Sequence, residues 1–81
     1  MIQQLKDIAV ELGFEELSNG TLFKDNKEIR FRITDNYNAV MLEVITNEDD
    51  YESYLFDMLD LDRANLTIED HISKLKKFVN S

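Results

Sequence analysis

The sequence has no cysteine, proline or tryptophan, and only two of its 81 residues are glycine. Without cysteine the chain forms no disulfide and offers no thiolate as a nucleophile or metal ligand. Gly13 and Gly20 stand alone, so the closely spaced glycines of a phosphate-binding loop are missing. A short chain without tryptophan also has little material with which to build a substrate cleft.

Long apolar runs are missing as well. The longest uninterrupted run covers residues 39–42, whereas a membrane-spanning helix needs about 20 such residues. Residues 1–7 lack the charged head and apolar stretch of a signal peptide. We therefore expect a cytoplasmic protein that does not associate with a membrane, and the lack of cysteine fits a reducing compartment.

Negative charge is what the sequence has in excess. Asp and Glu number 17 against nine Lys and Arg, the net charge is −8, and 43% of the residues are hydrophobic. The hydrophobic fraction indicates a folded chain, and this length indicates one domain over residues 1–81. The charge disfavours direct binding to nucleic acid, which needs clustered Lys and Arg. It favours a protein partner that presents a basic surface.

The N-terminal segment is predicted to be a helix over about residues 2–12. An apolar residue recurs every three or four positions, at Ile2, Leu5, Ile8, Ala9 and Leu12. Gly13 follows at the position of a C-terminal cap.

Residues 14–46 are predicted to form strands. Residues 28–34 alternate apolar and polar side chains with a period of two, which is typical of a strand with one buried face. Residues 39–46 are a strongly β-prone run and residues 21–24 a shorter one, preceded by the hairpin signal Asn19-Gly20. Residues 14–17 are a weak further candidate. We therefore expect an antiparallel meander of three or four strands.

Residues 47–62 fit two structures. Helical spacing is present in the apolar side chains of Tyr51, Tyr54, Leu55, Met58 and Leu59. Residues 47–50 would then form an acidic first helical turn. The alternative is a further strand, because residues 51–56 are rich in aromatic residues. We favour the helix.

The C-terminal segment is predicted to be a helix that begins after Thr67. Asp70 follows three residues later, which makes a variant of the capping box. The apolar stripe of this helix comprises Ile68, Ile72, Leu75 and either Phe78 or Val79. The expected fold class is α+β: an N-terminal helix, an antiparallel β-meander of three or four strands, and one or two C-terminal helices packed on one sheet face.

The charge is unevenly distributed along the chain. The net charge is −2 over residues 1–42, −9 over residues 43–70 and +3 over residues 71–81. In a helical segment the acids form one strip, beside which an exposed Phe56 could anchor an interface. We predict a partner-binding site that consists of Glu48, Asp49, Asp50, Glu52, Phe56, Asp57, Asp60 and Asp62. The alternative is an ordinary solvated face that keeps the protein soluble.

No residue pattern predicts catalysis or a metal site. His71 is the only histidine, and its sequence neighbours do not share its helical face, so we expect a surface or half-buried side chain. The segment from Asp60 begins like a calcium loop, but Ala64 and Asn65 replace a ligand and the glycine that such a loop needs. We therefore predict a protein that is not an enzyme and that has no metal or cofactor.

Three cations could form a small basic patch on the exposed side of the sheet, namely Lys24, Arg30 and Arg32. Single-stranded nucleic acid is one possible ligand of such a patch. We favour cross-strand pairing of these cations with Glu28 or Glu43 instead.

Together these observations favour a small acidic protein-binding module that occupies the basic groove of a nucleic-acid-handling protein. An order of one helix, three strands and two helices, combined with strong acidity, resembles small phage-encoded inhibitors of nucleic-acid enzymes. This resemblance implies a phage protein that mimics nucleic acid. The alternative is a self-associating structural or assembly module that uses a sheet edge or an exposed aromatic patch. Either a monomer or a homodimer is expected.

Overall fold

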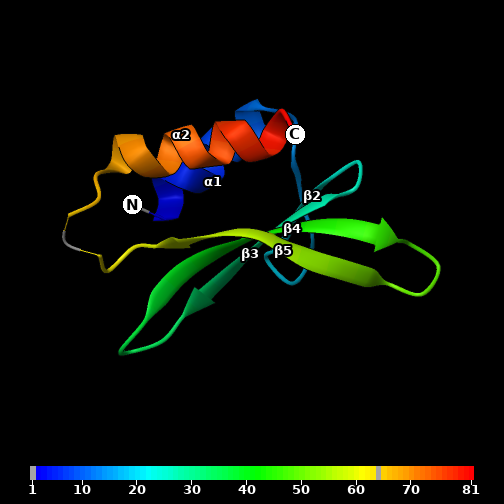
Figure 1. Cartoon of the computed structure of the whole chain (residues 1–81), viewed down its shortest axis with the longest axis horizontal. Helices are drawn as coiled ribbons and strands as arrows, with labels where there is room; N and C mark the ends of the chain where they lie inside the picture. The colour runs from blue at the N-terminus through cyan, green and yellow to red at the C-terminus, as the bar shows by residue number, and fades with distance from the viewer. Residues whose placement is uncertain (1, 64) are drawn as a thin grey trace.

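A computed structural model describes residues 2–63 and 65–81 of the chain. Two helices enclose five consecutive strands in the sequence (Figure 1). The elements are α1 (Ile2–Glu11), β1 (Glu15–Glu16), β2 (Leu22–Lys24), β3 (Lys27–Ile33), β4 (Asn38–Asn47), β5 (Glu52–Asp60) and α2 (Ile68–Val79). The α+β class is confirmed, with five strands in place of three or four and with one C-terminal helix in the described residues.

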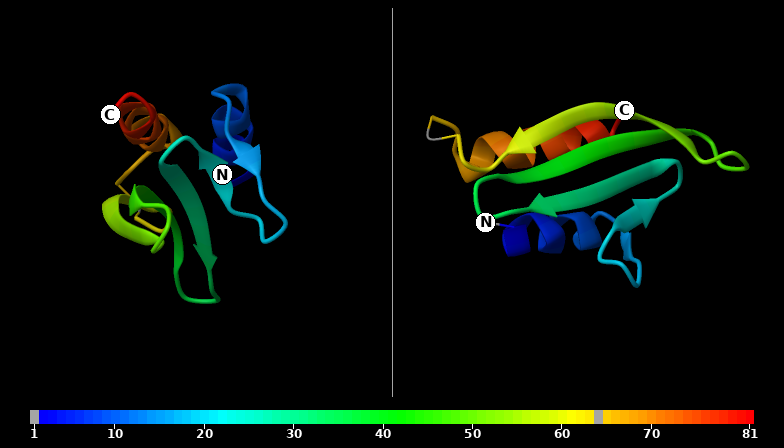
Figure 2. Two further views of the ribbon diagram at one scale, coloured as in Figure 1. Left: turned by 90° about the vertical axis from the view of Figure 1, so that its right-hand side faces the viewer. Right: turned by 90° about the horizontal axis from the view of Figure 1, so that it is seen from below.

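The strands form one antiparallel sheet in the order β1-β2-β3-β4-β5, so each strand pairs with its neighbour in sequence. Both helices lie against the same face of this sheet, as the end view in Figure 2 shows. We refer to this face as the covered face and to the opposite one as the open face. The expected meander with helices on one sheet face is confirmed.

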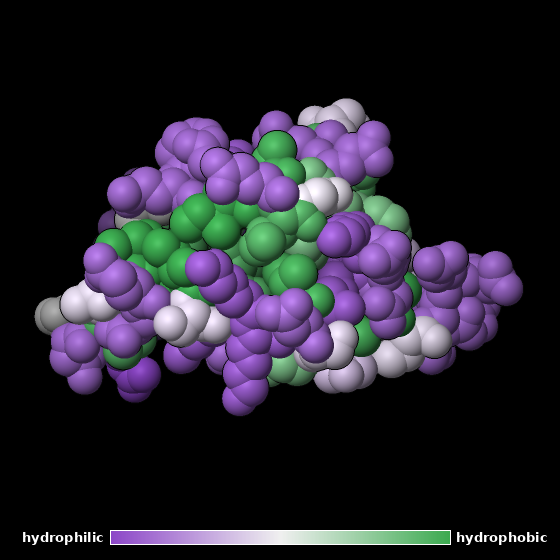
Figure 3. Space-filling model, turned by 90° about the horizontal axis from the view of Figure 1, so that it is seen from above, coloured by the Kyte–Doolittle hydropathy of each residue, from purple (hydrophilic) through white to green (hydrophobic). Residues whose placement is uncertain are grey.

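The core fills the space between the covered face and the helices. It consists of Leu5, Ala9, Phe14, Leu22, Ile29, Val40, Leu42, Leu59, Leu75 and Phe78. Partly buried side chains of both helices, including Ile8 and Ile72, pack against this cluster. Figure 3, which looks down on the helices, shows apolar surface between them and a hydrophilic end where the β4–β5 hairpin projects.

Polar contacts hold one end of each helix. The Thr67 side chain accepts a hydrogen bond from the Asp70 N–H, and the Asp70 carboxylate accepts one from the Thr67 N–H at 2.9 Å, which confirms the predicted capping box. The Asp70 carboxylate also accepts from the Thr67 hydroxyl at 3.1 Å, and the hydrogen bonds that it accepts from the Thr67 N–H and hydroxyl lower the pKa of Asp70. At the end of α1, Gly13 has a φ of +101° and Lys24 Nζ donates to the Leu12 carbonyl at 2.8 Å.

His71 is fully buried, with 0% of its surface exposed, so the expected surface or half-buried position is wrong. The reason is its spacing: residues 71, 75 and 78 share one helical face, and Leu75 and Phe78 are the other buried residues of α2. Neither ring nitrogen of His71 has a hydrogen-bond partner among the described residues.

Residues 52–60 form the strand β5, so the helix favoured for this segment is wrong and the alternative is confirmed. β5 pairs with β4 from Ala39–Asp60 to Asn47–Glu52. The reason lies in the pairing with β4: Leu59 pairs with Val40, and both side chains are buried in the core, which a helix over residues 51–59 would not provide. Long-range pairing outweighs the local helical spacing.

A β-bulge interrupts β5 at Phe56. Leu42 pairs with Asp57 and Glu43 with Leu55, so Phe56 is the extra residue of the bulge. The Phe56 ring lies 5.4 Å from the Phe78 ring of α2, measured between centroids, and the residue packs against the core. Phe56 is therefore half-buried and not the exposed aromatic that a helix would have presented.

Candidate functional site

The predicted acidic residues fall into two groups. Glu48, Asp49 and Asp50 lie in the turn between β4 and β5, and all three are exposed. Asn47 organises this turn: its side-chain oxygen accepts from the Asp49 N–H at 3.1 Å and the Asp50 N–H at 3.3 Å. Its side-chain amide donates to the Asp50 carboxylate at 3.2 Å. The turn thus presents its carboxylates at the projecting end of the hairpin (Figure 1).

The second group of acids lies along β5, which is the last strand of the sheet. Glu52, Asp57 and Asp60 belong to the strand, and Asp62 follows it directly. At about 3.3 Å per residue, Glu52 and Asp60 lie about 26 Å apart. The acids therefore do not form the compact strip of a helical face but a line along one sheet edge.

Exposed apolar side chains lie along the same strand. Tyr54, Leu55 and Met58 are all exposed, and Leu55 retains 51% of its surface. Sequence reasoning did not assign these residues to the site because the favoured helix used them as its buried stripe. The strand alternative carried part of the signal, since neighbouring residues of a strand point to opposite faces and only one of Tyr54 and Leu55 could then face the core.

Side chains occupy some of the backbone donors along the β5 edge. In the C-terminal half, the Met58 N–H donates to Asp57 Oδ1 at 2.8 Å, and beyond the strand the Asp62 N–H donates to Asp60 Oδ1 at 3.1 Å. In the N-terminal half, no side chain of the described residues accepts a hydrogen bond from the N–H of Ser53 or Leu55. We call residues 52–55 the open segment of β5.

A polar cluster on the open face fixes the turn to the sheet. Tyr51 closes the turn with a φ of +52°, and its hydroxyl donates to the Glu28 carboxylate and accepts from Arg30 Nη2, which lies at 2.7 Å. Glu28 is only 3% exposed although no helix covers this face. The hydrogen bond with Tyr51 raises the pKa of Arg30, and the hydrogen bond with Glu28 raises the pKa of Tyr51.

The expected cross-strand pairing is confirmed for Arg30, which pairs with Glu43 of β4, and is wrong for Arg32, which makes no ion pair among the described residues. Arg30 Nε lies 3.2 Å from Glu28 Oε1 and 3.0 Å from Glu43 Oε2. The Glu43 oxygen accepts no hydrogen bond from the described residues, so its contact with Arg30 is an ion pair only. Lys24 does not join this cluster, because its ammonium group donates to the Leu12 carbonyl.

Potential metal ligands do not gather in the part of the chain that the structure describes, where no group of three or more His, Asp or Glu side chains is placed to hold an ion. Ala64, at the fifth position of the segment that begins like a calcium loop, lies outside the described residues. Over the same described ranges, neither helix has the length and apolar character needed to cross a bilayer.

Comparison with known proteins gave no match to a family model, to a curated protein or to a solved structure. The order of elements that carried the resemblance to phage-encoded inhibitors also differs from the observed order, which has five strands and one C-terminal helix.

Proposed function

We propose that this chain is a non-catalytic protein-binding module that docks a basic partner through β5 and the turn before it. The observation that carries the proposal is the combination on one sheet edge of exposed apolar side chains, Tyr54, Leu55 and Met58, with a line of acids. Apolar anchors supply contact area at an interface, and rim charges steer the partner and set its register.

The open segment of β5 supports an extended partner in particular. A strand at the end of a sheet can pair with a segment of another chain through its backbone, while alternate side chains contact the partner from both faces. Leu55 pairs with Glu43 and Tyr54 pairs with Val44, so neighbouring side chains of this segment project to opposite faces. A bound segment would therefore contact an apolar side chain on either face.

The acids favour a basic partner over a second copy of this chain. Two β5 edges brought together would place Glu52, Asp57 and Asp60 of one copy near the same acids of the other, and like charges on paired strands are destabilising. Acidic edge residues are also a known protection against edge-to-edge aggregation. A partner segment rich in Lys or Arg would instead be attracted by these acids.

A nucleic-acid-handling protein is a second, more specific candidate for the partner. The feature that favours it is the spread of carboxylates from the turn to Asp62, which could follow a groove that normally binds phosphates. In this case duplex DNA and this chain would compete for the same surface of the partner.

The test is affinity capture from a lysate at low and at high salt, followed by mass spectrometry. The site variant is Glu48→Gln/Asp49→Asn/Glu52→Gln, and the control is Glu11→Gln/Glu15→Gln/Asp35→Asn. All six residues are exposed and the two triple variants change the net charge equally. We expect a basic protein to be captured at low salt by the wild type and by the control, and to be lost with the site variant.

Three outcomes separate the candidates. Displacement of the captured protein by duplex DNA supports the nucleic-acid-handling partner, whereas capture that survives added DNA supports a basic protein bound elsewhere. Equal loss with both triple variants would contradict the proposal, because net charge alone would then explain binding. Capture of this chain alone at both salts would support self-association instead.

A further inference from the structure

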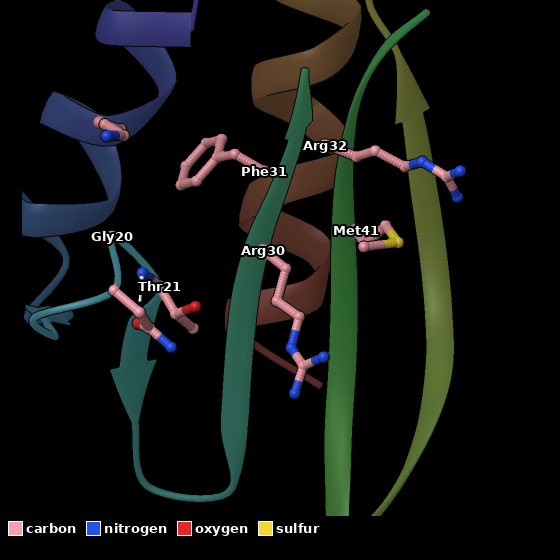
Figure 4. A pocket seen from close by; sticks show the side chains of 8 residues that line it. Gly20, Thr21, Arg30, Phe31, Arg32 and Met41 are labelled. Atoms are coloured by element: carbon pink, nitrogen blue, oxygen red, sulfur yellow. Dashed lines mark hydrogen bonds between the residues drawn. The ribbon is translucent and has the colours of Figure 1, made fainter. Parts of the chain in front are cut away.

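The sheet has a second open edge, on β3. The pairing of β2 with β3 ends at Leu22–Ile29, while β3 continues to Ile33. A hollow of about 470 Å³ lies there, between the turn that carries Thr21, the side chain of Lys6 on α1, and β3 (Figure 4). We call this the β3 hollow.

Because of the sheet register, the backbone N–H and carbonyl of Phe31 point into the β3 hollow. Asn38 directs its backbone toward the β5 side, since its N–H donates to Asp62 and its carbonyl accepts from the Leu61 N–H. Backbone direction alternates along an antiparallel strand, so Met41 of β4 faces β3, where its partner is Arg30. Phe31, one residue on from Arg30, therefore turns its N–H and carbonyl away from β4, to the side where β2 has ended.

The β3 hollow is basic although the chain carries a net charge of −8. The described residues that line it include the cations Lys6, Arg30 and Arg32 and no carboxylate. In Figure 4 the Phe31 ring points toward α1, whereas the side chains of Arg30 and Arg32 leave β3 on the other face and extend toward β4 and β5. A ligand at the β3 edge would therefore meet Lys6 on the covered face, and Arg32 on the open face would reach it by turning its side chain back toward β3.

The three cations differ in how far they are already engaged. Arg30 is held by Glu28, Glu43 and Tyr51, and Lys6 Nζ lies 3.6 Å from a Glu16 oxygen and 5.0 Å from the centroid of the Phe31 ring. Arg32 is exposed and makes no ion pair among the described residues. Arg32 is accordingly the cation most available to a ligand.

We propose that the β3 hollow binds an extended acidic peptide segment, which adds to the sheet beside residues 30–33. The backbone of the segment pairs with the N–H and carbonyl of Phe31, and its Asp or Glu side chains contact Arg32 on the open face and Lys6 on the covered face. A peptide fits better than a phosphate group because Phe31 offers both a donor and an acceptor, whereas a phosphate oxygen uses the donor alone. This site is separate from β5 and has the opposite charge preference.

The experiment is an NMR titration of the full ¹⁵N-labelled chain with the peptide Ac-Glu-Glu-Val-Glu-Glu-NH₂. We expect the largest shift changes at the amides of Phe31 and its neighbours in β3. Arg32→Gln should weaken binding about tenfold, the loss of one charge-assisted contact, while the control Arg63→Gln, at another exposed arginine after β5, should not change it. The spectra of the free variants show whether each one is folded.

Two further ligands make the outcome decisive. The peptide with Gln in place of every Glu should bind far more weakly, and inorganic phosphate should not displace the acidic peptide at equal concentration. Shift changes away from β3, equal weakening by Arg32→Gln and Arg63→Gln, or full displacement by phosphate would each overturn the proposal. None of these results tests binding at β5, because that proposal is tested with substitutions at Glu48, Asp49 and Glu52.

Discussion

Leu55 and Leu59 are the same residue type on the same strand, yet 51% of the surface of Leu55 is exposed and 0% of Leu59. Leu59 faces the helices and belongs to the core cluster, whereas Leu55 lies on the open face beyond the bulge at Phe56. The bulge therefore reverses the alternation of side chains along β5, so that Leu59 stabilises the fold on the covered face while Leu55 remains free for a partner on the open face. One strand performs both tasks because only its C-terminal half lies under α2.

The largest expected effect on stability concerns Leu59, the buried residue of this pair. Leu59→Ala should lower the free energy of unfolding by about 2–5 kcal/mol, since it leaves a cavity in the core. Leu55→Ala, the same chemical change on the exposed side of the bulge, should stay within about 0.5 kcal/mol. Urea denaturation of both variants measures the difference, and equal losses would show that the two halves of β5 are not separate in this way.

A smaller effect is expected where α2, the helix over the buried half of β5, begins. Thr67→Ala removes the two hydrogen bonds of the Thr67 hydroxyl, which accepts from the Asp70 N–H and donates to the Asp70 carboxylate, and it keeps the bond from the Thr67 N–H; the change should cost about 0.5–2 kcal/mol. The Thr67 N–H and the Thr67 hydroxyl together hold the pKa of Asp70 below its usual value of 3.8, so the contribution of the lost hydroxyl bond is complete above that value and is lost as the pH falls through the lower pKa of the folded state. Thermal unfolding at neutral and acidic pH should therefore separate wild type from Thr67→Ala more at neutral pH. A constant difference would contradict this assignment.

The smallest effect on stability is expected at the turn before the exposed half of β5. Tyr51→Phe removes the hydroxyl between Glu28 and Arg30, and it should loosen residues 48–51 without unfolding the core. Hydrogen exchange in the turn and the ultraviolet titration of tyrosine measure the two consequences. Because the folded-state pKa of Tyr51 is raised above its usual 10.0, its contribution is present below pH 10 and is lost as the pH rises through the folded-state pKa.

In the titration, Tyr51→Phe should remove an ionisation that lies above pH 10 in the wild type. The control is Tyr54→Phe, at an exposed tyrosine three residues further along the chain whose hydroxyl makes no hydrogen bond with the described residues. If both variants changed exchange in the turn equally, the cluster of Glu28, Arg30 and Tyr51 would not be what holds the hairpin.

Local patterns were sufficient to predict much of the fold. The period-two alternation of residues 28–34 corresponds to β3, and the pair Thr67 and Asp70 forms the cap of α2. These features depend on residues that are near neighbours in the sequence. β5 could not be decided in this way, because its spacing fits a helix and its structure depends on β4, a partner that lies across a turn.

The candidate site was only partly predictable for the same reason. The acids were found from charge counts, which do not depend on the fold, but their arrangement as an edge follows from β5 being a strand. Phe56 was assigned to the exposed side, yet the bulge turns it toward Phe78. The exposed Tyr54 and Leu55 were assigned to a buried stripe, which a helix would have required.

The central claim, that the exposed half of β5 is the docking surface, is tested most directly by a photo-crosslinking side chain introduced at Leu55. The matched control is Val10 on α1, which is 53% exposed compared with 51% for Leu55. We predict that the group at Leu55 crosslinks to a basic protein in a lysate at low salt and that the group at Val10 does not. Equal crosslinking from both positions, or crosslinking from Val10 alone, would contradict the claim.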